Sequence, residues 1–455
     1  MVSQGVLHDS QFGFRKSHST SHALNYSVFQ IQNALKQGFH VLGIFIDLSK
    51  AFDTIDHTIL LKKLEIYGVR GTPLKLLESY LSGREQSVSV LGETSDRLPV
   101  LYGVPQGSCL GPLLFLIYIN DLTNSKLQNT SYILFADDTN IFVVARSRSE
   151  AYANANKVLQ SVNNYTLANK LHVNVKKSCF IEFKSSKGKT DQQPLLIENR
   201  LYLNGLPLSQ VQDTKFLGIL IDERLTFDSH REKLARKLSS CSGRLCKIKD
   251  NIPQSIHKDL YHALFESHLS YGITVWGGTS NNKLQPLFVA QKKCIRIMFG
   301  DKEAYLGKFL TCARTRPMDE QKLTSKFFER EHTKPIFICQ ELMTLHNLYS
   351  YHCCNELFKI LKYRTPIALF ELFNLSKRTG NETLIVTTMP TNNFIHLASS
   401  LWNRVRQILC INDFGISQSV FKSRVKNLIL STQKKGDQIS WVPSVNFLNS
   451  GSLKP

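Results

Sequence analysis

Long apolar stretches are missing from this sequence of 455 residues. The longest apolar run, Leu110 to Ile119, contains Gly111 and Pro112 and is too short to cross a bilayer. The N-terminal segment has no apolar core of the kind that a signal peptide needs. The sequence therefore predicts an intracellular protein with no transmembrane segment and no membrane partner.

Cysteine is also scarce, with 10 residues scattered along the chain and no C-x-x-C pair. This pattern is unlike the regular spacing of a secreted disulfide framework, and it suits a reducing compartment. Cys353-Cys354 lies near His346 and His352 in the sequence, but the spacing matches no zinc site. We therefore expect structural roles for these residues.

Acidic residues are outnumbered, because 36 Asp and Glu stand against 56 Lys and Arg, which gives a net charge of +20. A globular chain this basic usually binds a polyanion, and nucleic acid is the leading candidate. The composition, 42% hydrophobic and 20% charged, argues against a disordered, collagen-like or coiled-coil chain. The length exceeds one ordinary core and predicts more than one domain.

The hydrophobic pattern of the first half predicts strands mixed with helices. The clearest strand, residues 41–46, is apolar throughout and should be buried on both faces. Asp56 is expected to cap a helix that extends through Leu64. A hairpin is expected from strands at 132–136 and 139–144, with Asp137-Asp138 as its turn. A further single strand is expected over residues 215–221.

After about residue 228 the pattern changes to helices rich in Lys and Arg. The expected helices cover residues 230–248, 255–271 and 284–298, and the signals over 301–455 are weaker but mostly helical. The sequence thus predicts a strand-and-helix unit followed by a basic helical unit.

Carboxylates stand where the apolar strands end. Asp47 follows the first strand, and Asp137-Asp138 comes 137 − 47 = 90 residues later at the tip of the hairpin. Burying unpaired carboxylates is costly, so a group of three needs cations, and Mg²⁺ prefers oxygen ligands. Two such ions can clamp an in-line phosphoryl displacement. The alternative is that Asp137-Asp138 is only a good hairpin turn.

Six segments follow one another in a fixed order over residues 4–225. They are Gln11-Phe12-Gly13-Phe14-Arg15, Asp47-Leu48-Ser49-Lys50-Ala51-Phe52-Asp53, Gly103-Val104-Pro105-Gln106-Gly107-Ser108, Phe135-Ala136-Asp137-Asp138, Asn174-Val175-Lys176-Lys177-Ser178 and Lys215-Phe216-Leu217-Gly218. In this order they resemble the fingers motif and motifs A, B, C, D and E of reverse transcriptases, nearest to the jockey and CR1-like LINE elements among non-LTR retrotransposons. Any single segment is weak evidence, whereas the ordered set is highly specific.

The resemblance implies a right-hand polymerase of the α+β class, whose palm is a split βαβ antiparallel sheet. The implied parts are partial fingers over 1–40, the palm over 41–227, a helical thumb over 228–300 and a C-terminal region of unknown role over 301–455. Full elements of this kind carry an endonuclease before the polymerase, whereas ten residues precede Gln11 here. We therefore expect no endonuclease and incomplete fingers, which leaves the activity of the chain open.

The implied activity is that of an RNA-directed DNA polymerase, which adds dNTPs to a DNA primer on an RNA template for retrotransposition in the nucleus. By resemblance, Asp47 and Asp137 would bind two Mg²⁺ ions, for which Mn²⁺ can substitute, and Asp138 would contribute more weakly. Lys177, with Lys176 as its rival, would protonate the departing pyrophosphate.

The resemblance also assigns residues to substrate binding. Leu48 would offer its backbone to the incoming triphosphate, and the ring of Phe52 would lie beneath the sugar and exclude a 2′-hydroxyl. Gln106 and Gly107 would face the nascent base pair, and Arg15 would contact phosphates.

The primer grip would be Phe216-Leu217-Gly218 by the same resemblance. Plainer interpretations stay open: Phe52 as a core residue, Lys177 as a solvated strand lysine and Arg15 as an exposed side chain. For the whole chain, the alternative is a non-catalytic nucleic-acid-binding remnant of a retrotransposon.

Overall fold

The structure is a computed structural model that describes residues 5–124, 128–185, 200–300, 333–373, 375–376, 383–384, 393–411 and 415–435. The chain divides into two compact units. The first unit holds residues 1–226 and 366–368, and the second holds residues 227–365 and 369–455. The assignment of fingers, palm and thumb to segments of the chain stays a prediction.

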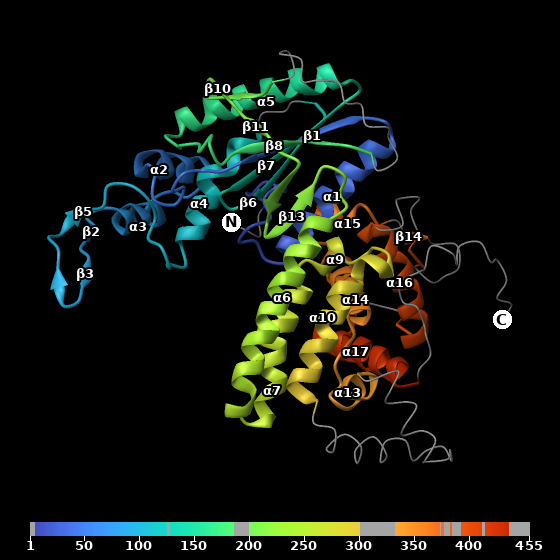
Figure 1. Ribbon diagram of the computed structural model, residues 1–455. Helices are drawn as coiled ribbons and strands as arrows, with labels where there is room; N and C mark the ends of the chain where they lie inside the picture. The colour runs from blue at the N-terminus through green and yellow to red at the C-terminus, as the bar shows by residue number, and fades with distance from the viewer. Residues whose placement is uncertain are drawn as a thin grey trace, which may run out of the picture. The chain divides into compact units, whose positions relative to one another are not determined.

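A five-stranded sheet with the order β11-β8-β1-β7-β6 forms the centre of the first unit (Figure 1). All of its pairings are antiparallel except that of β11 with β8. The strands are β1 (His40–Ile46), β6 (Thr130–Phe135), β7 (Asp138–Ala145), β8 (Cys179–Phe183) and β11 (Ser209–Gln210). The predicted α+β class and antiparallel sheet are confirmed.

Strand β1 is the middle of this sheet because its apolar side chains fill both faces. Every residue from Val41 to Ile46 is buried, as the apolar run predicted. Gly43 is required at the centre, since a Cβ there would come within 2.6 Å of the Phe183 ring and 3.1 Å of the Phe142 ring. Large aromatic side chains of the neighbouring strands therefore close over a backbone that has no side chain.

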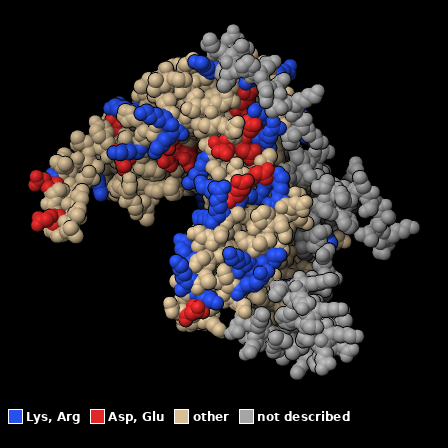
Figure 2. All heavy atoms as spheres, in the orientation of Figure 1, with Lys and Arg blue, Asp and Glu red and all other residues tan. Residues whose placement is uncertain are grey.

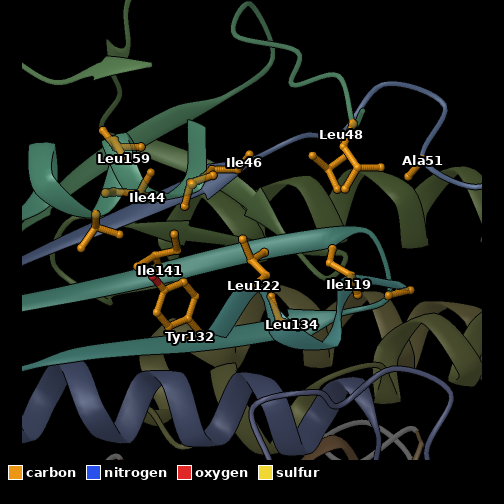
Figure 3. Packing of buried hydrophobic residues seen from close by; sticks show 14 of the residues in the cluster. Ile44, Ile46, Leu48, Ala51, Ile119, Leu122, Tyr132, Leu134, Ile141 and Leu159 are labelled. Carbon is orange, nitrogen blue, oxygen red and sulfur yellow. The ribbon is translucent and has the colours of Figure 1, made fainter. Parts of the chain in front are cut away.

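Helices cover both faces of the sheet. Side chains of β1, β6 and β7, among them Ile44, Ile141 and Leu134, pack in one cluster with Ile119 and Leu159 (Figure 3). Ile119 ends α4 and Leu159 lies on α5, while α1 crosses the opposite face (Figure 1). The helices are α1 (Thr20–Lys36), α2 (His57–Ile66), α3 (Thr72–Leu81), α4 (Gly111–Ile119), the 3₁₀ turn η2 (Asn120–Asn124) and α5 (Arg148–Ala168).

Helix α2 begins where the sequence predicts, because Asp56 caps it. The Asp56 carboxylate accepts the backbone N–H of Ile59 at 3.0 Å and pairs with Lys170 Nζ at 2.7 Å. Short two-stranded pieces complete the unit: β2 (Glu85–Gln86) with β5 (Leu98–Pro99), β3 (Ser89–Val90) with β4 (Glu93–Thr94), β9 (Tyr202–Leu203) with β10 (Leu206–Pro207), and β12 (Asp213–Phe216) with β13 (Ile219–Asp222).

The described part of the second unit is mostly helical. Helix α6 packs along α10, and buried Gln291 of α10 donates to Tyr261 Oη and accepts from the Leu345 N–H. The elements are α6 (Asp228–Ile248), η4 (Lys249–Asn251), α7 (Gln254–Tyr261), the π turn η5 (His262–Glu266), α8 (Ser267–Ser270), α9 (Ile273–Trp276), α10 (Asn281–Phe299), α13 (Lys334–Cys339), α14 (Leu345–Tyr363), α15 (Ile367–Phe370), β14 (Leu375–Ser376), β15 (Thr383–Leu384), α16 (Phe394–Leu409) and α17 (Gln418–Lys435).

The three basic helices expected after residue 228 are present as α6, as α7 with its continuation to Ser270, and as α10. The weaker helical signals further on correspond to α13, α14, α16 and α17, whereas residues 301–332 lie outside the described part. Among the described helices, none is long and apolar enough to cross a membrane.

Buried His230 should make the stability of the chain depend on pH. Its ring packs near Trp276, and burial, aided by the charges of Arg231 and Lys233, lowers the pKa of His230 to about 4. The unfolded chain takes up this proton near pH 6.5, so the free energy of unfolding should fall as the pH drops from 6.5 to 4. The loss is at most about 3 kcal/mol. Unfolding curves of wild type and His230→Phe over this range measure it.

The difference in the free energy of unfolding between wild type and His230→Phe, taken at each pH, separates the contribution of His230 from that of the carboxylates. The control is His40→Gln, which replaces the exposed first residue of β1 and should keep the wild-type pH dependence. If His230→Phe loses stability toward acid as steeply as the wild type does, His230 does not carry the effect.

Candidate active site

The turn between β6 and β7 carries the paired carboxylates. Phe135 pairs with Asp138 across the hairpin, so the two turn residues are Ala136 and Asp137. The prediction of Asp137-Asp138 as the turn was therefore wrong by one residue. The reason lies in the backbone: Ala136 takes the positive φ, +56°, that such a turn needs at its first position, and Asp138 is already the first residue of β7.

Asp47 meets this turn because β1 and β7 are antiparallel neighbours. Ile46 pairs with Thr139, so the residues that follow and precede them, Asp47 and Asp138, come to the same end of adjacent strands. The electrostatics agree with this placement. Partial desolvation raises the pKa of the still exposed Asp138, the charges of Asp137 and Asp47 raise it further, and Lys215 opposes them.

The three carboxylates suit hard cations. Carboxylate oxygens are the donors that Mg²⁺ prefers, and their mutual repulsion is what a bound cation would relieve. Within the described residues, no three Asp, Glu, His or Cys side chains are arranged to hold a metal ion by themselves.

The backbone of Asp47 is held by the turn that follows α5. The Asp47 N–H donates to Ser178 Oγ at 3.1 Å, and the Asp47 carbonyl accepts the N–H of Asn174 at 2.8 Å. Lys177 lies in this turn, where its own N–H bonds back to Asn174 and its side chain is exposed. The structure therefore brings the predicted Lys177 into the segment that fixes Asp47.

Phe52 lies on the loop after Asp47 and is only partly buried. Its ring stacks on Phe115 of α4 with 4.4 Å between ring centroids and 25° between planes. Leu48 is buried and bridges to Val173. Phe52 is thus anchored on one side by an aromatic partner and keeps part of its surface exposed.

The loop from Gly103 to Gly107 packs directly on the loop after Asp47. Gly103 has φ +84°, and a Cβ there would lie 2.8 Å from the Cα of Asp53. The Val104 N–H donates to the Phe52 carbonyl at 2.9 Å, and Gln106 Nε2 donates to Asp53 Oδ1 at 2.8 Å. Gln106 and Gly107 are both exposed. The structure therefore couples the two predicted substrate loops through Asp53.

Arg15 is held by its own loop. Its side chain is 12% exposed, donates to the carbonyls of His8 and Gln11, and lies 3.7 Å from the Asp9 carboxylate. Burial lowers the pKa of Arg15. The guanidinium thus braces residues 8–11, and its contact with phosphates stays a prediction.

The segment predicted as a single strand over 215–221 is a hairpin instead. Leu217 and Gly218 have φ values of +44° and +84°, which turn β12 back along β13. Phe216 is buried against Phe45 and Phe142 with centroid distances of 5.7 Å and 6.4 Å. The predicted primer grip is therefore an anchored hairpin tip on the sheet.

The sequence placed Lys215 in motif E but did not predict that its charge acts on Asp138. It is exposed on β12, next to the anchored Phe216, and its charge lowers the pKa of Asp138. Its place as the first residue of motif E was the available signal. Its closeness to the carboxylates depends on how the hairpin folds onto the sheet, which the sequence pattern does not encode.

Comparison with known proteins identifies the class. Residues 1–221 match the family described as "Reverse transcriptase (RNA-dependent DNA polymerase)". This part of the chain is similar to reverse transcriptase domains, and the chain resembles RNA-directed DNA polymerases of mobile elements.

Two of the relatives are polymerases from mobile elements of Drosophila melanogaster. The chain is 28% identical over 307 residues to the probable RNA-directed DNA polymerase from transposon X-element, which covers 66% of this chain and 33% of the relative. It is 26% identical over 357 residues to the RNA-directed DNA polymerase from mobile element jockey, which covers 73% and 37%. The chain thus spans about a third of the length of these curated relatives.

Among solved structures, telomerase from Candida albicans matches with 12% identity and a TM-score of 0.36, over 70% of this chain and 57% of the telomerase chain. A likeness this low carries no argument about the fold or the activity.

Proposed function

We propose that the chain is an RNA-directed DNA polymerase, which adds dNTPs to the 3′ end of a DNA primer on an RNA template and serves retrotransposition. The observation that carries the proposal is the meeting of Asp47 with Asp137 and Asp138 at the ends of β1 and β7. Carboxylates on adjacent strand ends, open to solvent, are suited to nucleotidyl transfer.

In this proposal Asp47 and Asp137 hold two Mg²⁺ ions, with Mn²⁺ as a substitute, and Asp138 supports them. When bound, the ions supply the positive charge that favours attack by the primer 3′-hydroxyl and departure of pyrophosphate. Lys177 donates a proton to that pyrophosphate from the turn that also fixes Asp47. Lys215 adds a positive charge beside Asp138.

Substrate selection is assigned to the two coupled loops. The Leu48 backbone faces the triphosphate, and the Phe52 ring, stacked on Phe115, lies under the sugar. Gln106 and Gly107 face the nascent base pair, and the bond from Gln106 to Asp53 keeps that loop in register with Phe52. The hairpin tip Phe216-Leu217-Gly218 supports the primer, and Arg15 holds the loop of the fingers that approaches the phosphates.

The proposed parts are fingers over 1–40, palm over 41–227 and thumb over 228–300. Thumb binding of the template–primer duplex is supported by charge, since patches of Lys and Arg side chains lie over helices of the second unit (Figure 2). The exposed basic residues of α6 are Lys233, Arg236, Lys237, Arg244 and Lys247.

Primer extension tests the proposal. A poly-rA template with an oligo-dT primer, dTTP and Mg²⁺ or Mn²⁺ should yield extended DNA and release pyrophosphate. A chain that binds this duplex at saturation and extends it under neither cation would instead be a non-catalytic remnant.

Duplex binding should weaken steeply with salt, because basic side chains that neutralise phosphates release counter-ions. With about three to five phosphates contacted, the dissociation constant should rise on the order of a hundredfold between 50 and 200 mM salt. Fluorescence anisotropy with a labelled RNA–DNA duplex measures this slope.

A pair of substitutions assigns the salt dependence to α6. Lys233 and Lys237 lie one turn apart and are exposed, so Lys233→Gln with Lys237→Gln should lower the logarithmic slope by about 2. Lys62→Gln with Lys75→Gln removes the same charge from exposed positions of the first unit as a control. Equal slopes for the two double variants would show that α6 makes no special contact.

A further inference from the structure

A short segment before α1 runs beside the edge strand of the sheet. The Leu134 N–H donates to the Ser10 carbonyl at 2.8 Å, and the Phe12 N–H donates to the Leu134 carbonyl at 2.8 Å. Gln11 is thereby bridged in parallel to Leu134 of β6. This places residues 10–13 next to the strand that leads into the turn of Asp137.

The Gln11 side chain reaches from this segment to the turn. It is 2% exposed, and its Oε1 accepts the N–H of Gly13 at 2.8 Å and the N–H of Ala136 at 3.1 Å. Ala136 is the residue with positive φ, a conformation that is unfavourable for a residue with a Cβ. The bond from Gln11 therefore supports the turn at its least favourable residue.

Gly13 brings the same segment into backbone contact with the turn. A Cβ on Gly13 would lie 2.4 Å from the nitrogen of Ala136 and 2.9 Å from the carbonyl carbon of Phe135. No side chain fits between the two backbones. Arg15 braces this arrangement, because its guanidinium donates to the Gln11 carbonyl.

We propose that Gln11 and Gly13 are positioning residues of the polymerase, which fix the Ala136-Asp137 turn and thereby the direction of the carboxylates on Asp137 and Asp138 toward metal ions. The inference rests on the proposed function, since it gives these two residues a task only if the carboxylates bind cations. Neither residue touches substrate or metal, and both act through the backbone of Ala136.

One Gln11 variant can test its effect on the turn separately from its effect on the stability of the fold. The Nε2 of Gln11 is buried and has no hydrogen-bond partner among the described residues, which is a cost of about 1–3 kcal/mol. Gln11→Met keeps the length of the side chain and removes both the useful acceptor and this costly donor. The thermal midpoint should therefore shift little, while the geometry of the turn should loosen.

The experiment measures Mn²⁺ binding to the whole chain without nucleotide or duplex, from the loss of the free Mn²⁺ signal in electron paramagnetic resonance. Gln11→Met and Gly13→Ala should each weaken Mn²⁺ binding by about tenfold or more, as the loss of supporting contacts does at metal sites. The affinity for an RNA–DNA duplex should stay near that of the wild type. Unchanged Mn²⁺ affinity in both folded variants would overturn the proposal.

The matched control is Asn156→Leu in the same unit. Like Gln11, Asn156 bridges two backbone groups, the Arg200 carbonyl at 2.9 Å and the Tyr202 N–H at 3.1 Å, but it lies on α5 away from the turn. Its loss should leave Mn²⁺ affinity unchanged. An equal fall of Mn²⁺ affinity in Asn156→Leu would make the effect of Gln11 a general loss of structure and overturn the proposal.

Rescue provides a second test. Glycine adopts positive φ without the penalty of a Cβ, so Ala136→Gly in the Gln11→Met background should recover part of the Mn²⁺ affinity. The absence of any recovery would contradict a role for Gln11 in supporting that backbone conformation.

A measurement on the wild type needs no variant to fold. The Ala136 amide should be protected from hydrogen exchange, because its N–H is bonded to buried Gln11, and rapid exchange would contradict the proposal. These readouts are independent of extension. If the wild type binds Mn²⁺ normally but fails the polymerase assay, the proposed function alone is refuted. If the wild type extends primers and both Gln11→Met and Gly13→Ala keep its Mn²⁺ affinity, the positioning role alone is refuted.

Discussion

Replacing Asp137 by asparagine is expected to abolish primer extension by this chain, with a fall of about a thousandfold or more in rate. The substitution keeps the size of the side chain and removes one charge from the group formed with Asp47 and Asp138. Several kilocalories per mole of transition-state stabilisation depend on cations held by that charge. Single-nucleotide incorporation under saturating duplex measures the effect.

Duplex binding separates this loss of chemistry from a loss of structure. Asp137→Asn should bind the RNA–DNA duplex as tightly as the wild type or slightly more tightly, because the surface becomes less acidic. Asp96→Asn is the matched control, since Asp96 is exposed on the small hairpins of the first unit and should tolerate the same change. Near-normal turnover by Asp137→Asn would show that the motif C assignment is wrong.

The second large effect is expected in sugar choice. Phe52→Val should increase the use of ribonucleotides relative to deoxyribonucleotides on the order of tenfold to a hundredfold. The partly exposed ring of Phe52 is held in place by its stack on Phe115, so it can act as a fixed floor beneath the sugar. Valine fills less of that space and leaves room for a 2′-hydroxyl. The measurement is the ratio of kcat/KM for dTTP and UTP.

Phe52→Tyr is the control for this prediction, because it retains the ring and should retain the preference for dTTP. If Phe52→Val leaves the ratio of kcat/KM for dTTP and UTP unchanged and lowers thermal stability, Phe52 is a core residue packed on Phe115 and does not select the sugar.

The sequence predicted the elements whose cause is local. An uninterrupted apolar run predicted β1, and the capping residue Asp56 predicted where α2 begins. The errors fall where a backbone dihedral angle decides the outcome. Ala136 and Leu217 both take positive φ, a conformation that their residue types do not announce, so one hairpin turn was placed a residue late and another was missed.

Only part of the candidate site could be predicted from the sequence. Asp47 and Asp137 could be predicted as a pair because each follows an apolar strand. The structure supplies the reason that they meet: β1 and β6 both run antiparallel to β7 between them, so both strands end at the same edge of the sheet. The hydrogen bond from Gln106 to Asp53 and the position of Lys215 near Asp138 could not be predicted, because both depend on how distant loops pack. Burial of Arg15 against carbonyls of its own loop was equally invisible in the sequence.

Template-directed incorporation tests most directly whether this chain is an RNA-directed DNA polymerase. Four short RNA templates that differ only in the first unpaired base are annealed to one DNA primer, and each is offered all four dNTPs with Mg²⁺. The primer should gain the complementary nucleotide on each template with the wild type, and it should gain none with Asp137→Asn. No incorporation at saturating duplex, or incorporation that ignores the template base, would contradict this prediction.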